Sequence, residues 1–268
     1  MGRVYTLVNQ KGGVGKTTTA INLGACLASL GQRVLIVDID PQANATSSIG
    51  VDKHSVKGGA YELLLGGAPA PALVLHNPRL KLSILPSSPS LAGAEVELVN
   101  ELGRESKLRQ ALEPLIDRYD YLLIDCPPSL GLLTVNGLIA AKDGVLIPVQ
   151  CEYLALEGLG ELTHTLQRVR SALFASLKVR GVILTMFDGR THLSSDVVAE
   201  VQKYFKDQVF ETIIPRSVRL AEAPSYGLPV LAYAPASSAA KAYDALAREL
   251  MKSDGVAVVE NAGVEDAG

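Results

Sequence analysis

A glycine-rich stretch near the N-terminus, KGGVGKTT at residues 11–18, contains the residue types that hold a phosphate. Residues without a Cβ let the backbone wrap closely around a phosphate and turn its N–H groups inward; here they are Gly12, Gly13 and Gly15. Lys16 could reach the β- and γ-phosphates of a nucleotide, and the Thr17 hydroxyl could bind Mg²⁺. A helix is expected to begin at Lys16, and its N-terminal dipole would also favour an anion. The stretch therefore predicts a nucleotide-binding loop.

This loop departs from the usual phosphate-binding pattern at one position. The pattern G-x-x-x-x-G-K-[ST] requires glycine at position 10, where this chain has Gln10, and Lys11 follows it. One lysine is enough to hold a phosphate, so the second lysine needs another explanation. We assign nucleotide contacts to the whole loop, in which Thr18 could donate a hydrogen bond to the α-phosphate; the assigned residues are Lys11, Gly12, Gly13, Val14, Gly15, Lys16, Thr17 and Thr18.

Three carboxylates follow apolar runs elsewhere in the chain. Asp38 and Asp40 lie at the end of the run VLIVD, and Asp125 ends the run YLLID. The carboxyl ends of strands form the ligand crevice of an open α/β sheet, where acidic residues can serve a cation and a water. A single aspartate at a strand end usually caps a turn. Three of them beside a phosphate-binding loop favour a catalytic site instead.

Short runs rich in Val, Ile and Leu alternate with helical patterns along the chain. Such nearly continuous apolar strands are typical of a parallel sheet covered on both faces. The predicted strands are 4–8, 34–38, 82–85, 121–125, 145–149, 182–186 and 209–215. The predicted helices are 16–30, 91–100, 106–118, 134–141, 156–173, 193–205 and 238–252. This alternation predicts a doubly wound α/β fold, with a mostly parallel sheet flanked by helices.

The composition is that of an ordinary soluble globular chain. Of its 268 residues, 48% are hydrophobic and 20% are charged, and the net charge is −3. A general electrostatic attraction to nucleic acid is therefore absent, and DNA binding would need a local basic patch. We expect a single P-loop domain over residues 1–252. A mobile acidic tail is expected over residues 253–268, which are small, acidic and short of aromatic side chains.

Several motifs agree on one family. Together they resemble the ParA/Soj group of partition ATPases, within the deviant-Walker-A family that also contains MinD. The resemblance covers nearly the whole chain. The motifs are KGGVGKTT (11–18), VDIDPQANAT (37–46), LLIDCPPSLG (122–131), TMFDGRT (185–191) and IPRSVRLAEAPSYG (214–227).

This resemblance implies slow hydrolysis of ATP with Mg²⁺, and it gives each lysine and carboxylate a role. Lys16 would serve its own nucleotide, while Lys11 would cross the interface of a nucleotide-dependent homodimer to the partner's nucleotide. A cation from a second subunit would neutralise charge on the transferred phosphoryl group, as an arginine finger does. Asp125 would hold Mg²⁺ through a water, Asp38 would support the metal shell, and Asp40 would orient the attacking water.

The base and DNA contacts also follow from the resemblance. The segment after residue 213 would close over the adenine, with backbone contacts from Pro215. Ser217 stands where many relatives carry asparagine, which leaves its contact with the base open. Arg190 is similar to an arginine implicated in DNA binding that does not depend on sequence, and Arg219 is a second candidate. Arg216 and Arg219 could also stack on the base, cross the interface or remain solvated.

We therefore expect an ATPase that partitions a chromosome or plasmid. Its partners would be non-specific double-stranded DNA and a ParB/Spo0J-like centromere-binding protein that stimulates hydrolysis, and it would be cytoplasmic and associated with the nucleoid, with no membrane partner. A MinD-like, membrane-associated regulator of cell division is the alternative, although the acidic C-terminus lacks a basic amphipathic helix. A metabolic synthetase or an anion-pump ATPase is a third class, for which the sequence shows no substrate pocket and no additional cysteines.

Overall fold

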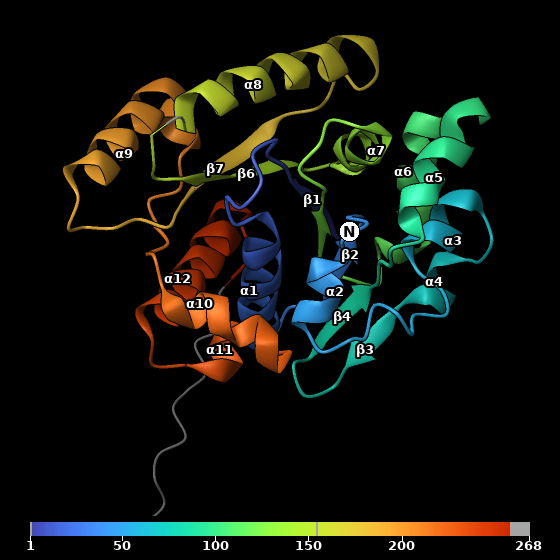
Figure 1. Ribbon diagram of the computed structural model, residues 1–268, viewed down its shortest axis with the longest axis horizontal. Coiled ribbons are helices and arrows are strands. Elements are labelled where there is room, and N and C mark those ends of the chain that lie inside the picture. The colour runs from blue at the N-terminus through green and yellow to red at the C-terminus, as the bar shows by residue number, and fades with distance from the viewer. Residues whose placement is uncertain (1, 154, 258–268) are drawn as a thin grey trace, which may run out of the picture.

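The protein, described here by a computed structural model over residues 2–153 and 155–257, is built around a seven-stranded sheet (Figure 1). The strand order is β3-β4-β2-β5-β1-β6-β7, and every pair is parallel except β3–β4. Strands β6 and β7 lie on one side of β1, and β5, β2, β4 and β3 lie on the other, so the chain extends the sheet in both directions from β1. The predicted doubly wound α/β fold is confirmed. The strands are β1 Arg3–Leu7, β2 Val34–Asp38, β3 Leu75–Asn77, β4 Leu82–Leu85, β5 Tyr121–Asp125, β6 Gly144–Gln150 and β7 Val179–Thr185.

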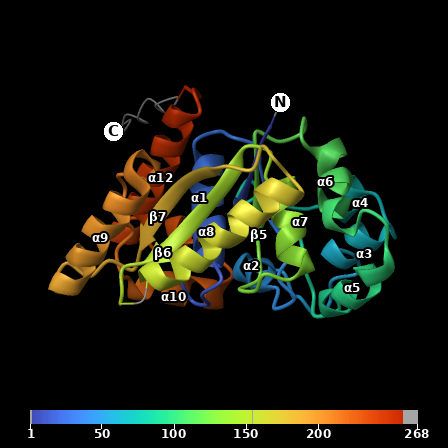
Figure 2. The same ribbon diagram turned by 90° about the horizontal axis from the view of Figure 1, so that it is seen from above.

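Helices cover both faces of this sheet (Figures 1 and 2). One face carries α1 Lys16–Ser29, α2 Asn44–Ser48, α10 Val218–Glu222, α11 Val230–Tyr233 and α12 Ser238–Ser253. The other carries α3 Ala60–Leu65, α4 Ala70–Leu73, α5 Leu91–Glu97, α6 Lys107–Leu112, α7 Leu132–Ala140, α8 Ala155–Ala172 and α9 His192–Phe205. Short 3₁₀ turns complete the chain at Leu98–Asn100, Arg104–Ser106, Glu113–Leu115, Lys206–Gln208 and Ala223–Tyr226.

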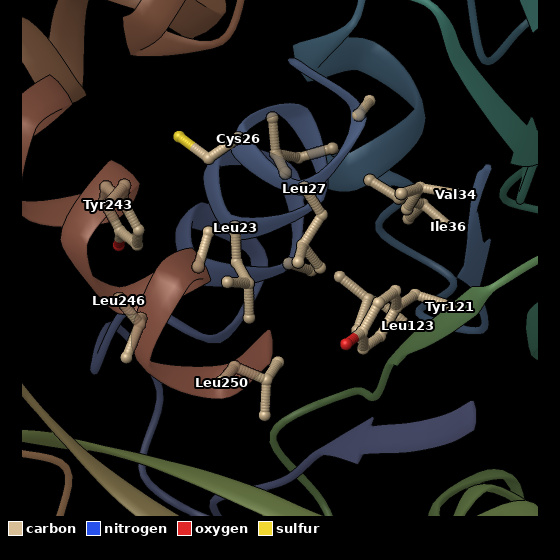
Figure 3. Close-up of a cluster of buried hydrophobic side chains, with 14 of the residues drawn as sticks. Leu23, Cys26, Leu27, Val34, Ile36, Tyr121, Leu123, Tyr243, Leu246 and Leu250 are labelled. Atoms are coloured by element: carbon tan, nitrogen blue, oxygen red, sulfur yellow. The ribbon is translucent and has the colours of Figure 1, made fainter. Parts of the chain in front are cut away.

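Alternate residues of each strand supply the two cores, because successive side chains of a strand point to opposite faces. In β2, Ile36 packs toward α1, while Leu35 packs toward the opposite helices. Figure 3 shows Leu23 and Leu27 of α1 in the first of these cores. A buried leucine contributes about 1.5–3 kcal/mol relative to an exposed one. These contacts fix the start of α1, and therefore the glycine-rich loop, against the sheet.

One expected strand is replaced by an irregular segment. The sequence predicts a strand over 209–215, but these residues form only isolated bridges, at Val182↔Val209 with β7 and at Phe187↔Pro215 just after the end of β7. Between the bridges, the carboxylate of Glu249 on α12 accepts hydrogen bonds from the backbone N–H groups of Glu211 and Thr212, at 2.7 and 3.0 Å. The Glu249 side chain, which is distant in the sequence, therefore accepts hydrogen bonds from backbone N–H groups of the segment in place of a regular β-ladder.

Other differences are smaller. The structure adds the antiparallel strand β3 at the sheet edge, and it adds the short helices α2, α3, α4, α10 and α11. The helix expected over 106–118 is only α6 followed by a 3₁₀ turn that contains Pro114. Proline lacks the N–H that a continuing α-helix requires.

The boundary of the acidic tail at residue 253 also needs correction. Helix α12 continues to Ser253, and the next side chain, Asp254, is only 4% exposed. Its carboxylate accepts hydrogen bonds from the hydroxyls of Tyr5 and Tyr121, at 2.7 and 3.1 Å. It also pairs with Arg180 at 2.8 Å and with Arg3 at 3.3 Å. The tail prediction for residues 258–268 lies outside the described residues.

Candidate nucleotide site

The glycine-rich loop joins β1 to α1 at the carboxyl edge of the sheet. Gly13 and Gly15 have φ values of +74° and +93°, a left-handed conformation that only glycine adopts without strain. A Cβ built on Gly12 or Gly13 would meet no atom within 4 Å. The loop therefore has an open side on which a ligand can approach its backbone.

Side chains from other strands hold this loop in place. The Asn9 side-chain amide donates to the Pro148 carbonyl within β6 at 2.8 Å, and the Asn9 Oδ1 accepts the Lys11 N–H at 3.0 Å. Thr185, at the end of β7, donates to the Val14 carbonyl at 2.8 Å. The loop is thus fixed at two points before any ligand binds.

The two lysines of the loop have different surroundings. Lys16 is 6% exposed, and its ammonium donates to the Lys11 carbonyl at 3.2 Å. Burial lowers the pKa of Lys16, while the charges of Asp125 and Asp40 act in the opposite direction. The Lys11 side chain is partly exposed and forms no ion pair with the described residues. The structure therefore places one lysine inside the loop and leaves the other toward its surface.

Asp125 is a buried acid whose carboxylate oxygens have no hydrogen-bond partner among the described residues. Its pKa is raised well above the usual range, first by burial and then by the neighbouring charge of Asp38, its register partner across β2 and β5. The Thr17 side chain approaches closely enough to lower that pKa, although it falls short of a hydrogen bond. Such orphaned buried oxygens can ligate a cation or accept hydrogen bonds from its bound water.

The other two carboxylates are held by their own turn. Asp38 accepts hydrogen bonds from the Thr46 N–H and hydroxyl at 2.8 and 2.7 Å, and from the Asp40 N–H at 3.1 Å. Burial raises the pKa of Asp38 to about 6. Asp40 accepts the Gln42 N–H at 2.9 Å, and Ser87 donates to its backbone carbonyl at 2.8 Å. Asp38 is thus occupied in shaping the turn that carries Asp40.

These acids do not form a metal cage by themselves. Within the part of the chain that the structure describes, no group of three or more His, Cys, Asp or Glu side chains is arranged to hold a metal ion. Mg²⁺ usually uses one or two carboxylates together with substrate phosphates and waters. Asp125 and Thr17 next to the open loop fit that requirement.

A cavity of about 250 Å³ lies beside the loop. Gly15 and Thr18 line one part of it, and Pro215 and Ser217 line another, so the structure brings the predicted phosphate and base contacts together. Tyr243 of α12 also lines it, and the Tyr243 hydroxyl lies 3.2 Å from that of Thr19. A larger hollow of about 1050 Å³, between residues 211 and 257, contains none of the predicted site residues.

The two predicted DNA contacts lie apart from this cavity. The side chain of Arg190 is 86% exposed and pairs with Asp188 at 2.6 Å. Arg219 pairs with Glu222 at 2.8 Å. No hydrogen bond or ion pair of the described residues joins the two arginines, so their common role in DNA binding stays a prediction.

Sequence reasoning missed several residues that support the site. They are hydroxyl and amide side chains: Asn9, Thr46, Ser87 and Thr185. Asn9, Ser87 and Thr185 lie at or just after the end of a strand, which is the one signal that could have identified them, whereas Thr46 lies in the short helix α2. Their partners are distant in sequence, so the pattern alone could not have assigned the bonds.

The comparisons agree on the kind of protein. A family model described as an AAA domain matches residues 2–179. The chromosome partitioning protein ParA of Myxococcus xanthus is 56% identical over 255 residues, covering 95% of this chain and 89% of that protein. The sporulation initiation inhibitor protein Soj of Bacillus subtilis is 52% identical over 250 residues, covering 93% and 98%.

A solved structure is also similar over nearly the whole chain. It is cobyrinic acid a,c-diamide synthase from Mycobacterium smegmatis with a bound ATP analogue and magnesium. The TM-score is 0.84 and the identity 38%, over 95% of this chain and 96% of that one. Within the described residues, no helix has the length and apolar character needed to cross a membrane.

Proposed function

Because the chain belongs to the ParA/Soj family and is an ATPase that acts in chromosome partitioning, we propose that it binds ATP and Mg²⁺ at residues 11–18 and hydrolyses ATP there. One observation carries the assignment of the site. Asp125 is buried beside Lys16 and the open glycine loop with no hydrogen-bond partner among the described residues, an arrangement that a bound cation and phosphate would satisfy. We assign the ATPase domain to residues 1–252, against which the side chain of Asp254 packs.

Each residue of the site has a stated task. The backbone from Gly12 to Gly15 surrounds the phosphates, and Lys16 neutralises charge on the β- and γ-phosphates. Thr17 and Asp125 hold Mg²⁺, the aspartate through a water, and the ion neutralises charge that develops on the phosphate oxygens. Asp40 orients the attacking water, and Asp38 supports the metal shell by fixing the turn that carries Asp40.

The cavity beside the loop takes the base. Thr18 hydrogen-bonds the α-phosphate at its entrance, and Pro215 presents backbone groups to the adenine. Ser217 lines the same cavity and takes part in binding the base.

Two copies form a homodimer when ATP is bound. Lys11 has no ion pair with the described residues, which leaves its ammonium available for the partner's nucleotide. The dimer brings two sets of Arg190 and Arg219 together and so binds double-stranded DNA without reading sequence. A ParB/Spo0J-like protein stimulates hydrolysis, and the ATP-bound form is associated with the nucleoid in the cytoplasm.

Light scattering of Asp40→Ala and Lys11→Ala tests this proposal. With Mg²⁺ and ATP, Asp40→Ala is expected to form a stable dimer without hydrolysis, whereas Lys11→Ala remains a monomer that still binds ATP. A monomeric Asp40→Ala at saturating ATP contradicts the proposal. Co-sedimentation with DNA and with liposomes, each with ATP and with ADP, separates this function from a MinD-like one.

A synthetase is the second candidate, because a solved structure 38% identical to this chain carries that name. ATP consumption measured with cobyrinic acid, and separately with DNA, distinguishes the two functions. Stimulation by cobyrinic acid alone favours the synthetase.

A further inference from the structure

Thr185 connects the last strand of the sheet to the phosphate-binding loop. It ends β7, its side chain is 2% exposed, and its hydroxyl donates to the Val14 carbonyl at 2.8 Å. The two residues are 171 positions apart in the sequence. A Cβ built on Gly15 would lie 3.7–3.8 Å from atoms of the Thr185 side chain, so this side chain faces Gly15 at the range of van der Waals contact for any larger residue.

The bond sets the direction of one peptide group. The carbonyl and the N–H of a trans peptide lie in its plane and point in opposite directions. Because the Val14 carbonyl points to Thr185, the Gly15 N–H points away from β7. The neighbouring loop residues Gly12 and Gly13 leave their surroundings open, and Gly15 holds a left-handed φ of +93°. The Gly15 N–H is therefore held in place before a phosphate arrives.

Thr185 also belongs to the cavity assigned to the base. It lines that cavity together with Pro215 and Ser217, and its backbone carbonyl accepts the Cys151 N–H at 3.0 Å. The next residue, Met186, has a φ of +54° and lines the same cavity. A single side chain thus contacts both the base cavity and the loop that surrounds the phosphates.

We infer that Thr185 is a positioning residue of the nucleotide site, whose hydroxyl orients the Val14–Gly15 peptide for the phosphate chain. The inference rests on the proposed function, because it concerns the same site. Its consequence is selective: loss of the hydroxyl weakens the binding of the phosphates and leaves the binding of the base unchanged.

Calorimetry with ADP and with adenosine tests this. Thr185→Val keeps the shape of the side chain but leaves the buried Val14 carbonyl unpaired, and ADP affinity is expected to fall about tenfold. Adenosine affinity should stay within about twofold, because adenosine carries no phosphate. Thr185→Ser restores the donor and should recover most of the ADP affinity.

Thr6→Val is a matched control. Thr6 is also buried in a strand, and its hydroxyl donates to the Gly137 carbonyl at 2.7 Å, outside the loop. This variant should lower thermal stability and leave the ratio of ADP to adenosine affinity as it is in the wild type. Should Thr185→Val fail to fold by circular dichroism, Thr185→Ala removes the same hydroxyl and must give the same selective loss.

The outcomes are distinct. Wild-type protein that binds no ADP contradicts the proposed function itself. Wild-type binding with unchanged ADP affinity in Thr185→Val overturns only the inference. An equal loss of ADP and adenosine affinity, or a Thr185→Ser variant no better than Thr185→Val, also overturns it.

Discussion

Two buried aspartates lie at opposite edges of the sheet, and they differ in what surrounds them. Asp125, at the carboxyl edge, has no hydrogen-bond partner for either carboxylate oxygen among the described residues. Asp254, at the amino edge, meets the hydroxyls of Tyr5 and Tyr121 and the guanidinium groups of Arg3 and Arg180. Both side chains are almost fully removed from water.

The contrast distinguishes Asp125, a candidate ligand-binding group, from Asp254, a structural group that holds the C-terminal segment. Leaving a buried carboxylate unpaired costs free energy of folding, and native proteins keep such groups where a ligand will satisfy them. A buried carboxylate whose oxygens are all engaged keeps its surroundings fixed and has no capacity left for a ligand. The comparison therefore supports the proposed catalytic site at one edge of the sheet, and it shows that the C-terminal segment is attached at the other.

The largest expected effect is on hydrolysis. Asp125→Asn should lower kcat for ATP by about 10²-fold or more, because the carboxylate that neutralises and orients the Mg²⁺ shell is lost. Steady-state ATPase assays over a Mg²⁺ series measure this. Asp254→Asn is the control, and its kcat should remain close to that of the wild type. Equal loss of activity in both variants would break the comparison.

The next effect is on stability, and it falls on the other aspartate. Asp254→Asn should lower the free energy of unfolding by about 2–3 kcal/mol, less than for a fully buried pair, because Arg3 and Arg180 reach solvent. A change of 1 kcal/mol shifts Tm by about 2–4 °C in a domain of this size. Thermal unfolding at neutral pH measures the shift. An unchanged Tm would mean that the C-terminal segment is not fastened through Asp254.

The pH dependence of stability should also separate the two edges. The pKa of Asp125 is raised in the fold, so its protonated form stabilises the protein below the unfolded value of about 4, and this contribution is lost as pH rises through the raised pKa. Without nucleotide, Asp125→Asn should match the wild type near pH 4 and exceed it at pH 7–8 by about 1–3 kcal/mol. Tm measured across pH tests the sign.

Adding Mg²⁺ and ATP should reverse that order. Mg²⁺ and ATP then stabilise the wild type strongly, but they stabilise Asp125→Asn only weakly because the variant binds them less tightly. If Asp125→Asn is less stable than the wild type at pH 7–8 even without ligand, the Asp125 carboxylate must be stabilised by another group of the protein. That result would contradict the contrast between the two aspartates.

The smallest expected effect is a difference in the free energy of unfolding between variants of two ion pairs near the amino edge of the sheet. Arg33 pairs with Asp120 at 2.7 Å, but both side chains are substantially exposed, so Arg33→Ala should cost less than about 1 kcal/mol. Arg180→Ala leaves Asp254 partly unpaired in a buried place and should cost more. Chemical denaturation of both variants ranks them, and a larger loss for Arg33→Ala would contradict the fastening role of Asp254.

Much of the sheet could be predicted because its signal is local. Strands β2, β4 and β5 match their predicted ranges to the residue, since each is a continuous apolar run buried on both faces. Strand β3 was missed because it is a three-residue edge strand without an apolar pattern. The segment 209–215 was wrongly predicted as a strand because a distant glutamate captures two of its N–H groups.

The candidate site likewise has parts that the sequence predicts and parts that it does not. Short sequence patterns identify the glycine loop and the aspartates. The structure brings them to the same edge of the sheet as Pro215 and Ser217. The bonds from Thr185 to Val14 and from Tyr5 to Asp254 join residues 171 and 249 positions apart, and no local pattern encodes them. A single buried side chain at a strand end becomes informative only when its partner is known.

The covering of β7 has a consequence for how copies of the protein can meet. The segment 209–215 runs along the outer side of this strand, and Phe210 and Ile214 donate backbone hydrogen bonds to Val182 and Leu184. An incoming strand therefore finds these carbonyls already taken, which protects this side from edge-to-edge polymerisation. The same segment ends at Pro215, which lines the cavity that we propose for the base, so one stretch of chain both covers this strand and lines that cavity.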